Sequence, residues 1–435
     1  MPPATPAALE LATAIINEVA RGARASAGLS EAIAARRLGP GQAEQLSALV
    51  YGALRRERRV SAALRELGVD LGRPEALRLV TIGAALLDGA ELLDLEAARL
   101  AWNEVSWQRF AQADRAALER SDGNARVALL GSLPDFLAAR LRDEYGEQAE
   151  ALAASLSEPA PRALRVNSLK ADVLDARERL QSEGARVSVG RFGRRCLVLE
   201  GAFNPFVTRA FHDGLFELQD EGSQIACELV APPPRGLVVD ACAGAGGKSL
   251  AVAAALENRG KVVSLDVDAQ KLVELRRRAK RAGAANVQAT AIAEQGELPA
   301  AVQALLGKAD RLLIDAPCSG TGVLRRNPEA RARLTRESLE RLVATQRAIV
   351  ERMLPLLAPG GRLVFVTCSL LRAEGEDLMA EVEAGHPELE PVNLAEIFDR
   401  GYIERFSRSA PHRVRLLPQL HTTDGFFVSV LRRKR

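Results

Sequence analysis

The sequence is short of the residues that usually hold metals. Among its 435 residues there are only four histidines, so we expect no histidine-rich metal site and no bound metal. The cysteines are odd in number and far apart, with no CxxC pair, which argues against a zinc site or a disulfide framework. We expect reduced thiols in a cytoplasmic protein. These thiols are Cys196, Cys227, Cys242, Cys318 and Cys368.

Long apolar runs are also missing. No stretch approaches the roughly 18 uninterrupted apolar residues of a membrane-spanning helix, so we expect no association with a membrane. The chain opens MPPATPAALELATAIINEV, where no basic segment precedes the apolar residues. We interpret this start as mature protein rather than a signal peptide.

The sequence has no large excess of charge of either sign. Lysine and arginine number 59, aspartate and glutamate 56, and the formal net charge is +3. That charge is too small to demonstrate a nucleic-acid partner by itself. Hydrophobic residues at 47% and charged residues at 26% are typical of a globular protein. At about 150 residues per domain the length predicts two or three domains, and nothing demands more than a monomer.

The first part of the chain predicts an all-helical domain. Over residues 43–58, Leu46, Leu49, Val50 and Leu54 recur at three- and four-residue spacing, which places them on one face of a helix. No strand-like alternation precedes residue 160.

A small α+β segment is expected to follow. An amphipathic helical stretch begins at Pro134, and short strands are predicted at 163–166 and 196–199 around a helix at 170–183. We therefore predict three parts: an all-helical domain at 1–130, a linker helix with the α+β segment at 131–215, and a third domain at 216–435.

The third part alternates apolar runs with helical patterns, as in a doubly wound sheet of buried parallel strands. Ligands bind beyond the carboxyl ends of the strands in such sheets. Three of the four runs end in an acidic residue, and two lead into a cysteine. The predicted strands are 237–240, 262–266, 311–315 and 362–367.

A glycine-rich loop follows the first of these strands, in the segment DACAGAGGKS (240–249). It fits neither the P-loop pattern, which needs glycine at Cys242, nor the dinucleotide pattern, which needs glycine at Ser249. An acidic residue before such a loop suits S-adenosylmethionine, whose methionine part carries an amine and a carboxylate. Asp266 ends the next strand, where a carboxylate can accept hydrogen bonds from ribose hydroxyls. A tight packing turn without a ligand is the alternative.

Two cysteines lie just beyond strand ends, on the side where the ligand is expected. Cys318 stands in DAPCSGTG (315–322) and Cys368 in TCS (367–369). A single cysteine in such a place is usually a buried apolar residue, but two in polar loops suggest chemistry. A thiolate that adds to C6 of cytosine makes C5 able to attack a methyl sulfonium. A second thiol could assist release, and Asp315 is placed to hold the base.

With these residues the chain resembles the Sun/Fmu (RsmB-like) family of RNA cytosine-C5 methyltransferases. The matching segments span roughly 216–431, and the N-terminal helices resemble the NusB-like RNA-binding domain around 46–59. The resemblance implies a Rossmann-like methyltransferase domain preceded by a small α+β segment and an all-helical NusB-like domain. The matches are FELQDEGSQ (216–224), CAGAGGKS (242–249), DVD (266–268), DAPCSGTGVLRRNP (315–328), TCSLL (367–371) and DGFFVSVL (424–431).

The resemblance also implies roles for single residues. Cys368 becomes the nucleophile that attacks C6, Cys318 the thiol needed for product release, and Asp315 a further catalytic residue. S-adenosylmethionine is the implied cofactor. Its expected binding residues are Cys242, Ala243, Gly244, Ala245, Gly246, Gly247, Lys248, Asp266, Glu294 and Asp315.

The sequence departs from the family pattern at three places. Gly244 and Ala245 replace the Ala-Pro of CAAPGGK, Ala332 stands where a tryptophan is usual, and residues 372–375 read RAEG instead of PEEN. These departures bear on substrate positioning more than on cofactor binding.

The implied substrate is RNA, and 16S ribosomal RNA is the leading target. Transfer RNA is the enzymatic alternative, and a non-catalytic RNA-binding assembly factor is the alternative from another class. With 4% aromatic residues, we expect base stacking at only one or two positions. Arginines at 55–59 and at 325–326 are expected to hold RNA, whereas the basic stretch 271–281 is more often a solvated helix face.

Overall fold

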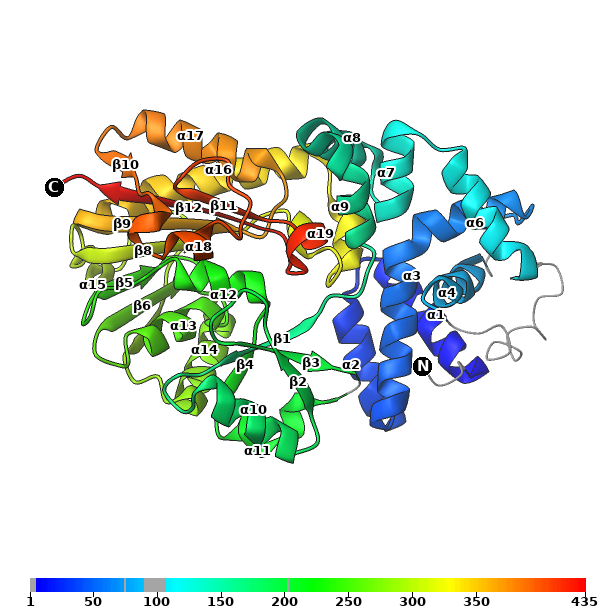
Figure 1. Ribbon diagram of the computed structural model, residues 1–435, viewed down its shortest axis with the longest axis horizontal. Coiled ribbons are helices and arrows are strands. Elements are labelled where there is room, and N and C mark those ends of the chain that lie inside the picture. Colours follow the sequence, from blue (N-terminus) through cyan, green and yellow to red (C-terminus); the bar gives the residue numbers. More distant parts are fainter. Residues whose placement is uncertain (1–4, 74–75, 90–106, 202) are drawn as a thin grey trace. The chain divides into compact units, whose positions relative to one another are not determined.

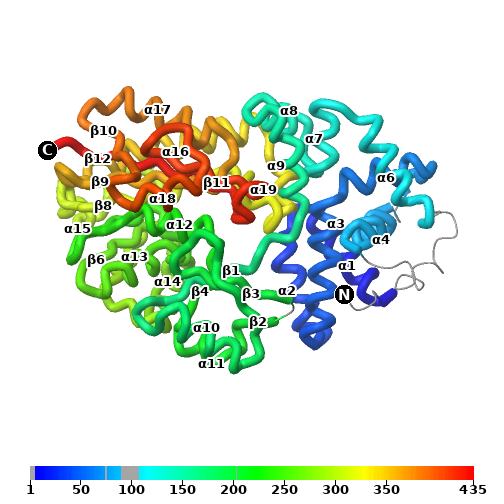
Figure 2. Tube along the Cα trace, viewed as in Figure 1, coloured from blue at the N-terminus to red at the C-terminus, as the bar shows by residue number. Residues whose placement is uncertain are grey.

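The computed structural model describes residues 5–73, 76–89, 107–201 and 203–435, and the chain divides into two compact units (Figures 1 and 2). The helical unit contains the described residues through Pro159 together with Val323–Arg336. The sheet-containing unit comprises Ala160–Gly322 and Glu337–Arg435. No helix among the described residues has both the length and the apolar character that a membrane crossing requires.

The helical unit has only helices among its described elements, as predicted. Leu46, Leu49 and Val50 are buried in its core, so the predicted helix face is confirmed. Its α-helices are α1 (Pro6–Ala20), α2 (Ala25–Arg36), α3 (Pro40–Glu66), α4 (Ala76–Leu87), α6 (Phe110–Glu119), α7 (Gly123–Gly131), α8 (Asp135–Tyr145) and α9 (Ala149–Ser155).

A distant stretch of sequence completes the helical unit. The 3-10 helix η6 (Pro328–Arg333) places Arg331 in the unit with 5% of its surface exposed. Its guanidinium donates to the carbonyls of Leu54 and Arg55 on α3 and to that of Leu156. The arginine thus joins the middle of α3 to the C-terminal end of α9.

The sheet-containing unit begins with a small four-stranded antiparallel sheet in the order β2-β3-β1-β4. The two predicted strands and the helix between them are confirmed, whereas β2 and β4 were not predicted. Leu164, Leu180, Leu197 and Phe216 form part of the core. The elements are β1 (Arg162–Val166), α10 (Val173–Ser182), β2 (Arg186–Val189), β3 (Cys196–Glu200), α11 (Arg209–His212) and β4 (Phe216–Leu218).

The larger sheet has the order β10-β12-β9-β8-β5-β6-β7, with β11 paired to β12. All four predicted strands are present, in β5, β6, β8 and β9, and they run parallel as expected. The first half of this layer consists of α12 (Glu221–Glu228), β5 (Leu237–Asp240), α13 (Gly247–Ala255), β6 (Lys261–Asp266), α14 (Ala269–Ala282), β7 (Val287–Ala291), α15 (Ala300–Gln303) and β8 (Ala309–Asp315).

The C-terminal strands make the sheet mixed rather than purely parallel. Strand β12 pairs antiparallel with β9, β10 and β11, an orientation that the apolar pattern could not predict. The remaining elements are α16 (Arg336–Met353), β9 (Leu357–Thr367), α17 (Glu376–Gly385), β10 (Leu389–Pro391), α18 (Arg400–Ile403), β11 (Arg413–Leu416), α19 (Pro418–His421) and β12 (Phe426–Arg433).

The parallel strands bring the predicted site residues to one edge. Strand β5 pairs with β6 on one side and with β8 on the other, so the chain changes direction across the sheet at this point. Ligands bind at such a switch point, beyond the carboxyl ends of the strands. Asp240, Asp266, Asp315 and Thr367 end the four strands there.

Candidate active site

The two predicted catalytic thiols lie together. Cys318 follows β8 and Cys368 follows β9, and their sulfur atoms are 3.3 Å apart. Because β8 and β9 are parallel neighbours with Asp315 opposite Val366, loops that leave their carboxyl ends must meet. The hydrogen bond with Cys368 and then burial raise the pKa of Cys318 well above the ordinary thiol value. One thiol can therefore stay protonated beside the other.

Lys248 and Asp315 form an ion pair next to the thiols. Lys248 Nζ lies 2.5 Å from Asp315 Oδ2, and the lysine side chain is 10% exposed. Burial alone would lower the pKa of Lys248, but the attraction of Asp315, and to a lesser degree of Cys227 and Cys368, raises it above its ordinary value. The site thus holds a buried ion pair whose lysine lies within electrostatic range of Cys368.

The glycine loop is held by the strand-end carboxylate predicted to bind ribose. Gly244 N donates to Asp266 Oδ2 at 2.7 Å, and Asp268 N donates to Asp266 Oδ1 at 2.8 Å. Gly246 has φ +86°, and a Cβ there would lie 2.5 Å from the Leu275 side chain. Both its conformation and its packing therefore require glycine.

A cavity of about 460 Å³ opens beside this loop. Five predicted cofactor residues line it, namely Cys242, Gly244, Asp266, Glu294 and Asp315. The remaining ones do not line it but build the loop and the first turn of α13; they are Ala243, Ala245, Gly246, Gly247 and Lys248.

The residues of the cavity fit a nucleoside cofactor. Val267, Ile292, Ile349 and Met353 provide apolar walls, which suit a flat base. The Asp266 carboxylate can accept hydrogen bonds from ribose hydroxyls, and the volume falls within the range of about 300–1,000 Å³ that is usual for ligand pockets. No group of three or more histidines, cysteines or carboxylates among the described residues could hold a metal ion.

The sequence analysis missed Glu374 of the RAEG segment. Its side chain is fully buried and accepts hydrogen bonds from Ser319 N (2.8 Å), Ser319 Oγ (2.5 Å), Ser369 Oγ (2.5 Å) and Gln346 Nε2 (2.9 Å). The two serines directly follow Cys318 and Cys368. One signal could have identified this residue: in RAEG (372–375), Glu374 retains the second glutamate of the family's PEEN, whereas the other three positions differ.

Asp240, at the end of β5, also belongs to the site region. It is 1% exposed and accepts a hydrogen bond from Ser249 Oγ at 2.6 Å, which in turn accepts one from Ser264 Oγ. Burial, partly offset by the Ser249 bond, raises the pKa of Asp240 to about 7. Its buried carboxyl joins β5, β6 and α13 below the glycine loop.

Within the arginine cluster at 55–59, the buried Arg55 and Arg56 need correction as RNA contacts. Arg55 is buried and contacts the Arg325 carbonyl, Arg56 pairs with Asp88, Arg59 makes two hydrogen bonds to Asp114, and Arg58 pairs with Asp135. Arg325 is also buried. These groups stabilise the helical unit, because a buried guanidinium must be hydrogen-bonded to offset its lost hydration. A basic run in sequence did not distinguish this use from RNA binding.

The fold and the site define a class, the Rossmann-like methyltransferases, and comparisons with known proteins identify the branch. The pattern of the 16S rRNA methyltransferases RsmB/F matches residues 227–432, and that of the ferredoxin-like domain of RsmF/B-like methyltransferases matches residues 133–205. The chain belongs to this family of ribosomal RNA methyltransferases, and its methyl donor is S-adenosylmethionine.

Individual relatives agree with this assignment. Ribosomal RNA small subunit methyltransferase B of Xylella fastidiosa (strain 9a5c) is 35% identical over 76% of this chain and 79% of its own. The probable methyltransferase B of Bacillus subtilis (strain 168) is 33% identical over 71% and 68%. The solved structure of a methyltransferase homologue from Pyrococcus horikoshii has a TM-score of 0.61 at 26% identity, covering 72% of this chain and 99% of that chain.

Proposed function

We propose that the protein methylates C5 of a cytosine in 16S ribosomal RNA and that Cys368 forms a covalent bond to C6 of that base. The observation that carries the proposal is the 3.3 Å separation of the Cys318 and Cys368 sulfur atoms beside the Lys248–Asp315 ion pair. A methyltransferase that acts on a nucleophilic nitrogen or oxygen would not need two thiols. Carbon 5 of cytosine needs one thiol for activation, because it is a poor nucleophile until C6 carries an electron-rich substituent, and a second thiol beside the first can assist release.

The chain's own residues carry the proposed reaction. The Cys368 sulfur donates an electron pair to C6, and Asp315, held by Lys248, holds the base edge. S-adenosylmethionine supplies an electrophilic methyl group, which C5 takes as the C–S bond of the sulfonium breaks. C5 then gives its proton to solvent water, the electrons of the C5–H bond form the C5=C6 double bond, and the C6–S bond breaks with its electron pair returning to Cys368. Cys318, adjacent to that sulfur, assists this last step.

The experiment compares two variants on a denaturing gel with RNA and cofactor. Cys368→Ala should form no adduct and transfer no methyl group. Cys318→Ala should form the adduct, transfer the methyl group and keep the RNA attached, which gives a slow, protease-sensitive band. The reverse pattern would exchange the two roles. Absence of a band in both variants, together with retained methyl transfer in Cys368→Ala, would exclude the covalent mechanism.

The choice of RNA needs a separate measurement. Bisulfite mapping of total RNA from a deletion strain should show the loss of a 5-methylcytosine in 16S ribosomal RNA. Loss of a transfer RNA signal instead would favour the enzymatic alternative. An unchanged map, combined with no transfer in vitro, would favour a non-catalytic assembly factor.

A further inference from the structure

One buried carboxylate connects the loops that carry the two thiols. Glu374 lies in the 3-10 helix η8 (Arg372–Glu374), between β9 and α17, and its side chain has no exposed surface. Its Oε1 accepts from Ser319 N and Gln346 Nε2, and its Oε2 accepts from the hydroxyls of Ser319 and Ser369. A single side chain thus holds the residue after each cysteine.

Burial of a carboxylate is costly unless several donors surround it. Four donors converge on Glu374, and hydrogen bonds to a charged group are about twice as strong as neutral ones. Gln346 of α16 also donates to the Pro317 carbonyl at 2.9 Å, so the same network fixes the residue before Cys318. The network therefore determines the positions of both loops relative to each other.

We propose that Glu374 is a positioning residue that keeps the Cys318 and Cys368 sulfur atoms in register, so that adduct release follows methyl transfer. This inference rests on the proposed function. Attack on C6 needs one thiol, whereas release needs both in the correct relation. Loosening the network should therefore slow release more than attack.

The hydrogen-bond pattern allows charge and geometry to be tested separately. In Glu374→Gln the amide oxygen can still accept from Ser319 N and Gln346 Nε2, while the amide nitrogen faces two serine hydroxyls that can rotate to accept. Glu374→Ala removes the whole network. The negative charge of Glu374 also contributes, after the Cys368 hydrogen bond and burial, to the raised pKa of Cys318.

The experiment measures RNA trapped on the protein during turnover, alongside cofactor affinity by calorimetry. Because a misplacement of about 1 Å can slow a step roughly 100-fold, we expect Glu374→Ala to release RNA roughly 10- to 100-fold more slowly and to accumulate the adduct. Glu374→Gln should turn over without accumulation. Cofactor affinity should match wild type in both, which a general loss of folding would not allow.

Several outcomes would overturn the positioning role. Release at the wild-type rate in Glu374→Ala would do so, as would equal accumulation in Glu374→Ala and Glu374→Gln, which would show that charge rather than geometry matters. If Glu374→Ala does not fold, Ser319→Ala and Ser369→Ala each remove one hydroxyl arm, and absence of accumulation in both would contradict the role. Failure of wild type to methylate RNA would instead reject the proposed function.

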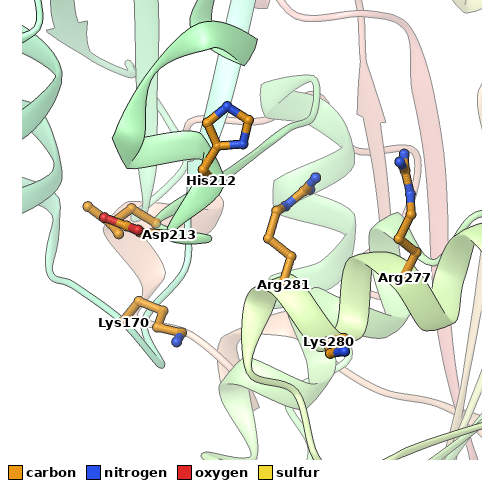
Figure 3. Close-up of a pocket in the computed structure, with 7 residues that line it drawn as sticks. Lys170, His212, Asp213, Arg277, Lys280 and Arg281 are labelled. Carbon is orange, nitrogen blue, oxygen red and sulfur yellow. The ribbon is translucent and has the colours of Figure 1, made fainter.

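A second inference concerns a basic cavity between the small sheet and α14. The cavity has a volume of about 660 Å³ and is lined by Lys170, His212, Asp213, Leu215, Arg277, Lys280 and Arg281. Figure 3 shows Lys170, His212 and Asp213 on one side and the α14 residues on the other, around an open space. Four of these side chains are permanent cations and one is a carboxylate.

The cations of this cavity differ in whether they form ion pairs with carboxylates. Arg281 pairs with the buried Glu217 and stacks 4.0 Å above the Phe211 ring, and Arg277 pairs with the neighbouring Glu274. Lys170 and Lys280 are exposed and have no ion pair within the described part of the chain. Two ammonium groups without carboxylate partners leave this cavity with positive charge that the fold does not neutralise.

We propose that this cavity binds a phosphodiester of the substrate RNA, through Lys170 and Lys280. The inference also rests on the proposed function, which provides a polyanionic substrate. Such contacts position the RNA without reading its sequence. The basic stretch at 271–281, for which a solvated face was the favoured interpretation, would then contribute to binding through Lys280 and not through its paired arginines.

Salt dependence of RNA binding tests the cavity. Each lost phosphate contact should reduce the slope of log affinity against log salt by about 1. We expect the double variant Lys170→Ala/Lys280→Ala to lose about 1 to 2 from this slope and to raise KM for RNA, with kcat and cofactor affinity unchanged. The double variant Lys261→Ala/Lys308→Ala, which changes two exposed lysines outside the cavity, should behave as wild type.

A slope equal to that of wild type in Lys170→Ala/Lys280→Ala would overturn the cavity proposal, as would an equal loss in the control pair. If wild type binds and methylates RNA in the same assay, neither result affects the proposed function.

Discussion

At the scale of single residues, the buried Asp240 links the stability of the site to pH. Its pKa is raised to about 7, mainly by burial, whereas the unfolded chain has the ordinary aspartate value near 4. Between these values the folded state keeps a proton that the unfolded state has released. Folding stability therefore falls as pH rises from about 4 to 7 and is constant in this respect above that range.

Asp240→Asn should remove this dependence. Between pH 5 and pH 8 the unfolding free energy of wild type should fall by about 2 to 3 kcal/mol through this group, and that of the variant should not. Denaturant unfolding at several pH values measures the difference, and Glu297→Gln, an exposed carboxylate in the same unit, is the control. Parallel pH profiles for wild type and Asp240→Asn would show that Asp240 ionises normally in the fold.

Asp266 provides a second test at this scale. Because its two oxygens hold the Gly244 and Asp268 amides and line the cavity, Asp266→Ala should weaken cofactor binding. A lost hydrogen bond to a charged group costs about 1.5–3 kcal/mol, or roughly 10- to 100-fold in affinity. Calorimetry with S-adenosylmethionine measures this. The control Asp268→Ala, in the same turn but outside the cavity lining, should retain the affinity of wild type. If Asp266→Ala binds S-adenosylmethionine as tightly as Asp268→Ala, Asp266 does not bind the cofactor.

The sequence predicted the positions of those site residues that directly follow a recognisable strand. The thiols and strand-end carboxylates meet because parallel strands end at one edge, so their positions followed from the pattern alone. Glu374 could not be found in this way, since its role depends on serines that lie five and fifty-five residues away in sequence. The predicted RNA contacts of Arg55 and Arg56 were wrong for a similar reason, because the partners of these arginines come from distant segments that no local pattern indicates.

At the scale of elements, two backbones touch where the Cys318 loop meets the start of β12. Gly322 N donates to the Cys368 carbonyl, and Gly425 N donates to the Gly322 carbonyl, both at 2.9 Å. A Cβ on Gly322 would lie 2.2 Å from the Gly425 oxygen. The last glycine of DAPCSGTG is therefore required by the antiparallel strand beside it, which was not among the strands predicted from the apolar pattern and appeared only as the family match DGFFVSVL (424–431).

Gly322→Ala should separate these two segments. Overpacking of a tight contact costs about 1–3 kcal/mol, and because the displaced loop carries Cys318, methyl transfer should also slow. Thermal unfolding and a tritium-release assay measure the two effects. Gly385→Ala, where a Cβ would meet nothing within 4 Å, is the matched control. An unchanged rate and stability in Gly322→Ala would mean that the contact relaxes without consequence.

At the scale of the whole molecule, the two units are interleaved in sequence. The chain leaves the sheet-containing unit after Gly322, contributes Val323–Arg336 to the helical unit, and returns at Glu337. Only four residues separate Cys318 from the start of this insertion. The sequence pattern placed the first boundary at 130/131, whereas the first compact stretch runs to Pro159. An insertion of fourteen residues has too little pattern of its own to be assigned in advance.

This interleaving bears on whether the N-terminal residues fold alone, which remains a prediction. A fragment of residues 1–159 contains the helices of the unit but lacks Arg331, whose guanidinium bonds the carbonyls of Leu54, Arg55 and Leu156, the last two of them buried. Leaving a buried acceptor unpaired costs about 1–3 kcal/mol, so we expect the fragment to be helical but less stable.

A synthetic peptide of residues 323–336 should raise the Tm of the fragment in a concentration-dependent manner, because a ligand that binds only the folded state stabilises it. The same peptide with Arg331→Met keeps the bulk but not the donors, and it should have little effect. Circular dichroism melts with each peptide measure the difference. Equal stabilisation by both peptides would assign the contact to apolar packing, and no effect of either would show that the helical unit is complete without the insertion.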